Sequence, residues 1–284
     1  MQNLHGFMCG RNPCRSMDGA LDRRRLLFCG MLGAVASTGL WGVDGAHAVD
    51  TGSVQVLAAS DLKFALTRVA ALYQKDTGQA IALTFGSSGN MARQIQQGLS
   101  AHIYMSADED LVLQLVRAGL TRGGDSGVLY ALGRLAFLVA PGSAIPPDAR
   151  LQGLRQHGAT VRKFAIANPE HAPYGRAARE ALQSLGLWDW VQPRLVLGDN
   201  IAQATQFVST GAAQAGITAL SLVMAPELRG QGAFVALPPE LHRPLRQRMV
   251  LLAKAPAAAQ TFYQYLQQAA ARAVLAEYGF GAPA

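Results

Sequence analysis

The sequence predicts an α/β fold with two lobes, each built on a mainly parallel sheet. From Val54 onward, short apolar runs alternate with segments whose apolar residues recur at helical spacing. This rhythm is typical of parallel strands joined by helices that cover the sheet. The 284 residues are 50% hydrophobic and only 15% charged, which excludes intrinsically disordered, collagen-like and coiled-coil proteins. A chain of this length forms one large domain or two lobes of roughly 100–150 residues each.

Residues 1–48 predict an export signal that is removed from the protein. Arginines 23–25 precede the uncharged segment 26–43, and an Ala-His-Ala triplet follows at 46–48. A basic start, an apolar middle and a small-x-small end are the three parts of a secretory signal, and consecutive arginines suit the twin-arginine route. We therefore expect cleavage after Ala48 and a periplasmic protein. The alternative is a membrane anchor, because the apolar segment is close to the minimum length that spans a bilayer.

The charge and cysteine counts change when this segment is removed. All three cysteines lie within it. Its loss lowers Lys plus Arg from 25 to 20 and Asp plus Glu from 18 to 15, so the net charge falls from +7 to +5. The remaining excess is spread along the chain, and we expect no nucleic-acid partner. The densest basic cluster, Arg243, Arg246 and Arg248, fits a solvated edge or a docking point for a membrane partner.

The first lobe is predicted from residues 49–135 together with the end of the chain, 246–284. Gly78 and Gly98 stand where glycine commonly terminates a helix. Ser106 and Glu109 have the spacing of a capping box at a helix start. The expected elements are strand 54–59, helix 62–77, strand 80–85, helix 90–97, strand 102–105, a helix ending near 118, strand 249–253 and one long helix, 256–278.

The second lobe is predicted from residues 136–245. A strong apolar strand leads into a proline-rich stretch at 141–147, after which the alternation of strands and helices resumes. Ligands of such folds bind at the carboxyl ends of the strands, where helices begin. The expected elements are strands 135–140, 163–167, 195–197, 215–219 and 233–237 and helices 175–185 and 201–208.

Four strand-to-helix loops share one composition, in which glycine or small residues and hydroxyl or amide groups come directly before a helix. A helix N-terminus presents unpaired backbone N–H groups and a partial charge of about +0.5, which together suit an anion. Several such ends at one place would bind an oxyanion without Lys or Arg. The loops are 58–61, 86–89, 168–175 and 198–201. The second of them lacks the spacing of a nucleotide P-loop and of a serine-hydrolase elbow.

These loops and three further motifs resemble the periplasmic molybdate-binding proteins of ABC transporters, from about Val54 to Phe280. The resemblance implies a type II periplasmic binding protein fold, with two α/β lobes joined by crossing strands and a ligand cleft between them. It implies a monomer without catalysis or cofactor that captures molybdate, and tungstate, and delivers it to a membrane ABC permease. Molybdenum would enter only as the oxyanion, with no direct protein ligand. The motifs are AASDLKFA at 58–65, FGSSGN at 85–90, SAD at 106–108, YALGRL at 130–135, NPEHAPYG at 168–175, GDNI at 198–201 and LSLV at 220–223.

The resemblance also implies five ligand-binding residues. Ser60 and Asp61 match the first anion loop of the family, and Ser88 matches a second hydroxyl donor. Tyr174 and Ile201 match positions whose backbone N–H groups reach the oxyanion. Together they would offer a dianion only neutral donors.

Asp61 needs its own interpretation, because a carboxylate beside a bound dianion would repel it. We expect its side chain to cap the following helix while its backbone N–H faces the ligand. The alternative is that Asp61 accepts a proton from a protonated oxyanion, which would favour hydrogen phosphate. Some relatives also have a tyrosine donor where this chain has Ala219, so the Tyr174 hydroxyl is a candidate replacement.

Two alternatives to molybdate capture remain open. Another tetrahedral oxyanion, such as sulfate or phosphate, suits the same donors. A hydrolase would use Ser88 as nucleophile with His171 or His102 as base, but the sequence names no group that would orient the base. A metal site lacks any recognisable ligand spacing, so we expect no enzyme. The possible ligands of such a metal site would be Asp108, Glu109, Asp110, Glu170 and His171.

Overall fold

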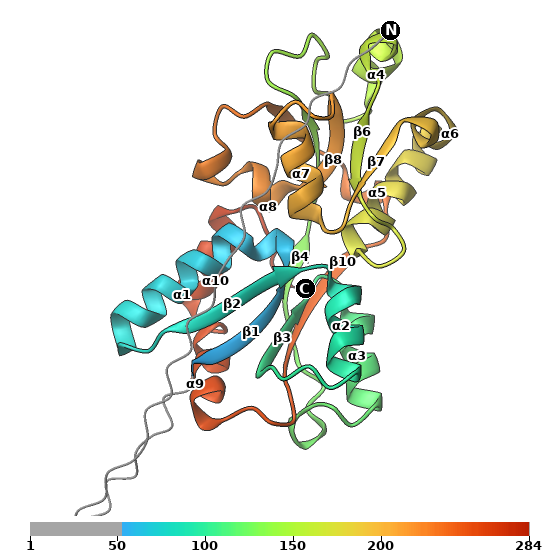
Figure 1. Ribbon diagram of the computed structural model, residues 1–284. Coiled ribbons are helices and arrows are strands. Elements are labelled where there is room, and N and C mark those ends of the chain that lie inside the picture. The colour runs from blue at the N-terminus through green and yellow to red at the C-terminus, as the bar shows by residue number, and fades with distance from the viewer. Residues whose placement is uncertain (1–52, 284) are drawn as a thin grey trace, which may run out of the picture. The chain divides into compact units, whose positions relative to one another are not determined.

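The computed structural model describes residues 53–283 (Figure 1). The predicted export signal and its cleavage point lie outside the described residues. Ten strands of the described part form two five-stranded sheets with helices on both faces, which confirms the predicted α/β fold. The expectation that the sheets are mainly parallel is wrong, because each sheet is mixed, with two parallel and two antiparallel pairings.

The first sheet has the strand order β2-β1-β3-β10-β4. Its central strand is β3, and β1 pairs in parallel with both β2 and β3. Strand β10, which comes late in the sequence, runs antiparallel to both β3 and β4. The bounds are β1 Val54–Ala59, β2 Ile81–Gly86, β3 Ile103–Ser106, β4 Val128–Gly133 and β10 Leu245–Leu251.

Helices cover both faces of the first sheet. Successive side chains of a strand point to opposite faces, and accordingly Val56 and Leu57 of β1 belong to different apolar clusters. Val56 packs with residues of α1, α9 and α10, whereas Leu57 packs with residues of α2 and α3. The helices are α1 Lys63–Thr77, α2 Ser88–Gln96, α3 Glu109–Arg117, α9 Ala257–Tyr265 and α10 Ala269–Glu277.

The second sheet has the order β7-β6-β8-β5-β9. Strand β6 pairs in parallel with β7 and β8, while β5 runs antiparallel to β8 and β9. The bounds are β5 Leu135–Val139, β6 Phe164–Ala167, β7 Leu195–Gly198, β8 Ala215–Ala219 and β9 Ala233–Ala236.

The helices of the second sheet follow the same two-sided arrangement (Figure 1). Phe137 and Ile166 pack with buried residues of α4 and α5, whereas Leu138 and Ala165 pack with residues of α7 and α8. The helices are α4 Gln152–His157, α5 Pro173–Ser184, α6 Trp188–Val191, α7 Ile201–Ser209 and α8 Leu220–Val223. Short 3₁₀ turns are η1 Ser60–Leu62, η2 Arg122–Gly124, η3 Gly158–Thr160, η4 Gln192–Arg194, η5 Pro226–Leu228 and η6 Pro239–Leu241.

Two chain segments connect the sheets. The chain leaves the first sheet at Gly133 and enters the second at Leu135, and it returns from Ala236 to the first sheet at Leu245. Strand β10 therefore starts directly at the junction of the two sheets. It carries Gln247, which is fully buried.

Two predicted elements differ from the structure at the end of the chain. The long helix expected over 256–278 is divided into α9 and α10, because Gln268 is extended (φ −74°, ψ 157°) and starts a new helix. Strand β10 begins at Leu245 instead of residue 249. Arg246 and Arg248 alternate there with buried residues, so the segment has no continuous apolar run. Strand β4 was not among the predicted elements.

The capping box predicted at Ser106 and Glu109 is wrong. Asp108 is the N-cap of α3, and its Oδ1 accepts a hydrogen bond from the Asp110 backbone N–H at 3.0 Å. Ser106 Oγ instead accepts from the Asp108 backbone N–H at 3.1 Å. The Glu109 carboxylate turns to the arginines of β10, so it is unavailable to the backbone.

Candidate functional site

The five predicted ligand-binding residues lie around one small cavity of about 10 Å³. Each is at most 3% exposed. Ser60 and Asp61 come from η1 and Ser88 from the start of α2, all beside the first sheet. Tyr174 and Ile201 come from the starts of α5 and α7 beside the second sheet. The space is about that of one water molecule. The other lining residues are Ala59, Gly86, Ser87, Ala107, Ala172 and Pro173.

The two serine hydroxyls at the cavity act as acceptors toward the protein. Ser60 Oγ accepts from the Ala202 backbone N–H at 3.3 Å, and Ser88 Oγ accepts from the Ala107 backbone N–H at 3.1 Å. A hydroxyl has one hydrogen besides its two lone pairs. Each serine can therefore donate that hydrogen to a ligand while it keeps its backbone contact.

Backbone N–H groups of two helix starts complete the donor set. Tyr174 is the second residue of α5, after Pro173, and Ile201 is the first residue of α7. Amides of the first helical turn have no acceptor within their own helix. The Asn200 side chain caps α7 by accepting from the Gln203 N–H at 3.1 Å, which leaves the Ile201 amide to other acceptors.

Asp61 does not cap the following helix, so that expectation is wrong. Helix α1 begins at Lys63 without a side-chain cap. Asp61 Oδ2 accepts from the Tyr174 hydroxyl at 2.9 Å and from Gln247 Nε2 at 2.6 Å, and its backbone carbonyl accepts from the Ser221 hydroxyl at 2.8 Å. Its Oδ1 is buried and has no hydrogen-bond partner among the described residues. Burial raises the pKa of Asp61 from 3.8 to about 6, although the hydrogen bonds from Gln247 and Tyr174 oppose the shift.

The Tyr174 hydroxyl therefore has a different role from the one suggested for it as a ligand donor. It donates to Asp61 instead. Burial, followed by the Asp61 charge, raises the pKa of Tyr174 well above its usual value, so the phenol keeps its hydrogen.

Gln247 and Tyr130 are buried polar residues of the site that the sequence analysis missed. Tyr130 donates to Gln247 Oε1 at 2.7 Å, and Gln247 Nε2 also lies 3.1 Å from the Tyr174 oxygen. The chain of contacts thus joins β4, β10, η1 and α5. Gln247 lies between two arginines on a strand whose alternate residues are buried. That alternation of buried and less buried positions was the signal that could have identified Gln247. It was missed because the predicted strand began only at residue 249.

The loop 168–175 packs directly on the start of α2. Ser87 Oγ lies 2.9 Å from His171 Nδ1 and donates to the His171 carbonyl at 2.7 Å. The Gly89 backbone N–H donates to the same carbonyl at 3.0 Å, and a Cβ on Gly89 would lie 2.5 Å from it. Asn90 Nδ2 donates to Asp199 Oδ1 at 3.1 Å. Only glycine allows the two elements to approach this closely.

The arrangement required by the hydrolase alternative is not formed. The imidazole of His171 contacts Ser87, whereas Ser88 Oγ contacts the Ala107 amide. His102 Nδ1 accepts from the Gln55 backbone N–H at 3.0 Å, near the opposite end of β1. Neither histidine is thus placed to activate Ser88.

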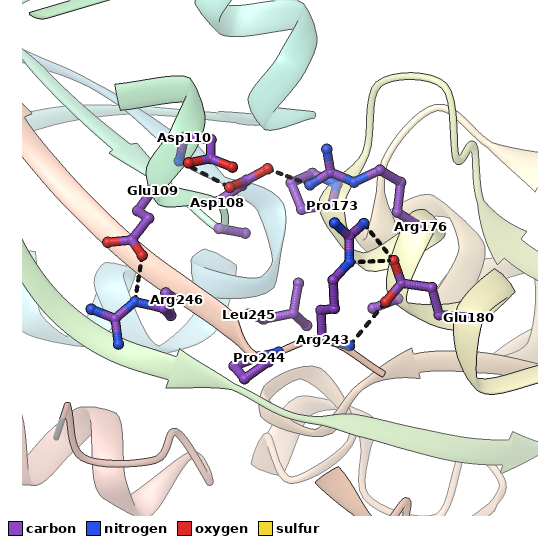
Figure 2. Close-up of a pocket in the computed structure, with 12 residues that line it drawn as sticks. Asp108, Glu109, Asp110, Pro173, Arg176, Glu180, Arg243, Pro244, Leu245 and Arg246 are labelled. Atoms are coloured by element: carbon purple, nitrogen blue, oxygen red, sulfur yellow. Dashed lines mark hydrogen bonds and ion pairs between the residues drawn. The ribbon is translucent and has the colours of Figure 1, made fainter. Parts of the chain in front are cut away.

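Two of the acidic residues considered as metal ligands, Asp108 and Glu109, pair with arginines in a groove of about 200 Å³. Figure 2 shows the contacts of Asp108 with Arg176 and of Glu109 with Arg246. No group of three potential metal ligands occurs within residues 53–283. The cluster Arg243, Arg246 and Arg248 is likewise engaged in ion pairs, Arg243 with Glu180 at 2.6 Å and the other two with Glu109.

In the described part of the chain, none of the helices has the length and apolar character needed to cross a membrane.

Comparisons with known proteins agree with this fold. The family model for bacterial extracellular solute-binding proteins matches residues 54–281. Molybdate-binding protein ModA of Azotobacter vinelandii is 36% identical over 238 residues, which is 83% of this chain and 92% of that protein. ModA of Rhodobacter capsulatus is 33% identical over 232 residues, 81% of this chain and 88% of that protein. The solved periplasmic molybdate-binding protein of Azotobacter vinelandii matches with a TM-score of 0.75 at 29% identity, covering 82% of this chain and all of that one. The chain belongs to the bacterial extracellular solute-binding protein family.

Proposed function

We propose that this protein captures molybdate, and also tungstate, in the periplasm and delivers it to an ABC permease. The observation that carries the proposal is the meeting of Ser60, Ser88, Tyr174 and Ile201 at one small buried cavity. The relatives named above as molybdate-binding proteins support the choice of ion.

The cavity would bind a dianion through neutral donors. Neither Lys nor Arg is among the described residues that line it. Two hydroxyls and the first-turn amides of α5 and α7 are fixed by the fold, and helix N-termini favour negative charge. Such preorganised dipoles replace the hydration of the ion. A lining without Lys or Arg among the described residues also favours release at the permease.

Selection against sulfate would depend on size, because sulfate has the same charge and the same tetrahedral shape. The lining comes from helix starts and loops beside both sheets, so its dimensions depend on how closely the lobes approach. Closure of the lobes about the crossing segments would bury the ion and form the surface that the permease recognises.

Calorimetry on the purified protein with molybdate, tungstate, sulfate and phosphate tests the proposal. We expect binding of molybdate and tungstate, with a rise in melting temperature as their concentration increases. Tight binding of sulfate or phosphate without binding of molybdate would reject the proposed ion.

Ser88→Ala tests the location of the site. Loss of one donor to a buried anion costs about 1–3 kcal/mol, which is roughly a fivefold to 150-fold loss of affinity. Thr67→Ala is the matched control, because it removes a hydroxyl on the exposed side of α1. Equal affinities of Ser88→Ala and the control would place the site elsewhere, and turnover of an ester substrate that Ser88→Ala abolishes would revive the hydrolase alternative.

A further inference from the structure

Asp61 is the one carboxylate among the described residues that line the cavity. It is only 1% exposed, and its two oxygens differ sharply in their surroundings. Oδ2 is occupied by two hydrogen bonds, from Tyr174 and Gln247, whereas Oδ1 has no partner among the described residues. A buried polar atom without a partner is costly, and an explanation is required for it.

Among residues 53–283, no Lys, Arg or His forms an ion pair with this carboxylate. The side chains that face it are the phenol of Tyr174 from α5 and the amide of Gln247 from β10, with the phenol of Tyr130 behind Gln247. The Ser221 hydroxyl of α8 donates to the backbone carbonyl of Asp61, and the backbone N–H groups of Asp61 and Leu62 lower the pKa of the carboxyl. Burial accordingly raises the pKa of Asp61 to about 6. An ionised Asp61 beside an oxyanion would add a direct repulsion between like charges.

We propose that Asp61 binds the oxyanion as a neutral carboxylic acid whose Oδ1 hydrogen is donated to the ligand, so that each dianion enters with one proton. The proton comes from solvent, adds to the Asp61 carboxylate as the ion binds, and returns to solvent when the ion leaves. No other bond is made or broken. This inference deepens the proposed function and depends on it.

The protonated acid would set which oxyanions the site prefers. A carboxylic acid at Oδ1 is a donor and suits an ion whose oxygens are all acceptors, such as molybdate. A hydrogen phosphate ion brings a proton of its own and would need an acceptor there. The charge state of Asp61 thus distinguishes the two ligand classes by chemistry, in addition to cavity size.

The test is calorimetry of the full chain with sodium molybdate between pH 5.5 and 8.5, in buffers of different ionisation enthalpy. We expect uptake of nearly one proton per ion at pH 8 and little uptake below pH 6. Above pH 6 the dissociation constant should rise about tenfold per pH unit, because the free carboxylate must first take up a proton.

Asp61→Asn provides the matched neutral residue, with an amide donor of nearly the same shape. It should bind molybdate without proton uptake and with an affinity independent of pH, about 100-fold tighter than the wild type at pH 8. Asp148→Asn, at the distant cap of α4, should keep the wild-type pH profile. His171→Gln tests the imidazole at Ser87, and loss of the pH dependence in that variant instead of in Asp61→Asn would overturn the inference.

The remaining outcomes separate the inference from the proposed function. Molybdate binding by the wild type with no proton uptake and a flat pH profile overturns the inference alone. Tight phosphate binding that Asp61→Asn abolishes would make Asp61 an acceptor, which also overturns it. Absence of molybdate binding in both the wild type and Asp61→Asn, at every pH, rejects the proposed function itself.

Discussion

Replacement of Asp61 by asparagine should stabilise the ligand-free protein at neutral pH. The pKa of Asp61 rises from 3.8 to about 6 because of burial, so the folded protein binds this proton more tightly than the unfolded chain. The folded state therefore holds more protons between these two pH values, and its stability falls as pH rises through them. One pH unit of pKa difference corresponds to about 1.4 kcal/mol, which gives a penalty of about 3 kcal/mol above pH 6.

The expected difference in unfolding free energy between Asp61→Asn and the wild type is near zero below pH 3.8 and reaches about 3 kcal/mol at pH 7. Asparagine keeps an oxygen to accept from Tyr174 and Gln247, so the hydrogen bonds at Oδ2 are retained. In a protein of this size, 3 kcal/mol corresponds to roughly 6–12 °C in melting temperature.

Urea unfolding without oxyanion, from pH 4 to 8, measures this difference directly. Comparison of the two proteins at each pH cancels the other carboxylates, such as Glu109 and Asp148, whose pKa values are lowered. Parallel stability profiles for the two proteins would refute the reasoning, since they would mean that Asp61 is equally protonated in the folded and unfolded states.

Three further predictions concern contacts around the cavity. Gly89→Ala should weaken molybdate binding about tenfold or more, with a smaller effect on unfolding, because the alanine Cβ would lie 2.5 Å from the His171 carbonyl oxygen. Calorimetry measures the affinity and thermal unfolding the stability, and an unchanged affinity would contradict the prediction. Glu109→Gln should lower stability at pH 7 by about 1 kcal/mol, because the pairing with two arginines of β10 requires the carboxylate. The loss should vanish as the pH falls below the lowered pKa of Glu109 in the wild type. A loss that persists in acid would exclude this cause. Gln247→Leu should cost about 2–3 kcal/mol, because it leaves the Tyr130 hydroxyl only the longer contact with the Ser106 carbonyl, at 3.4 Å, and removes a donor to the buried carboxylate. A neutral result in urea unfolding would show that water replaces the amide.

The alternation of strands and helices could be predicted because it depends on local apolar patterns. The ends of the helices and strands were harder to predict, since they depend on groups distant in sequence. Glu109 has the position of a capping residue, but Arg246 and Arg248 compete for its carboxylate. The break between α9 and α10 is not marked by proline or glycine at Gln268, so helical periodicity alone continued through it.

The loops that line the candidate site could be predicted from their composition before a helix, and the resemblance to a known family pointed to the five residues within them. The partners of Asp61 could not be predicted. Gln247 and Tyr174 are far from it in sequence, and only the pairing of β10 between β3 and β4 brings the amide to the carboxylate. A helix cap is the locally favoured role for aspartate, and here contacts from distant strands override it.

The contact between Gly89 and His171 has an uneven consequence for sequence variation. Position 89 contributes a backbone N–H and must also lack a Cβ, whereas position 171 accepts through its carbonyl, which every amino acid possesses. A library that randomises both positions and is selected for ion binding should therefore retain glycine at 89 almost exclusively and accept many residues at 171. Tolerance at one side of a contact and intolerance at the other would identify the backbone, and not the imidazole, as the part that the binding site requires.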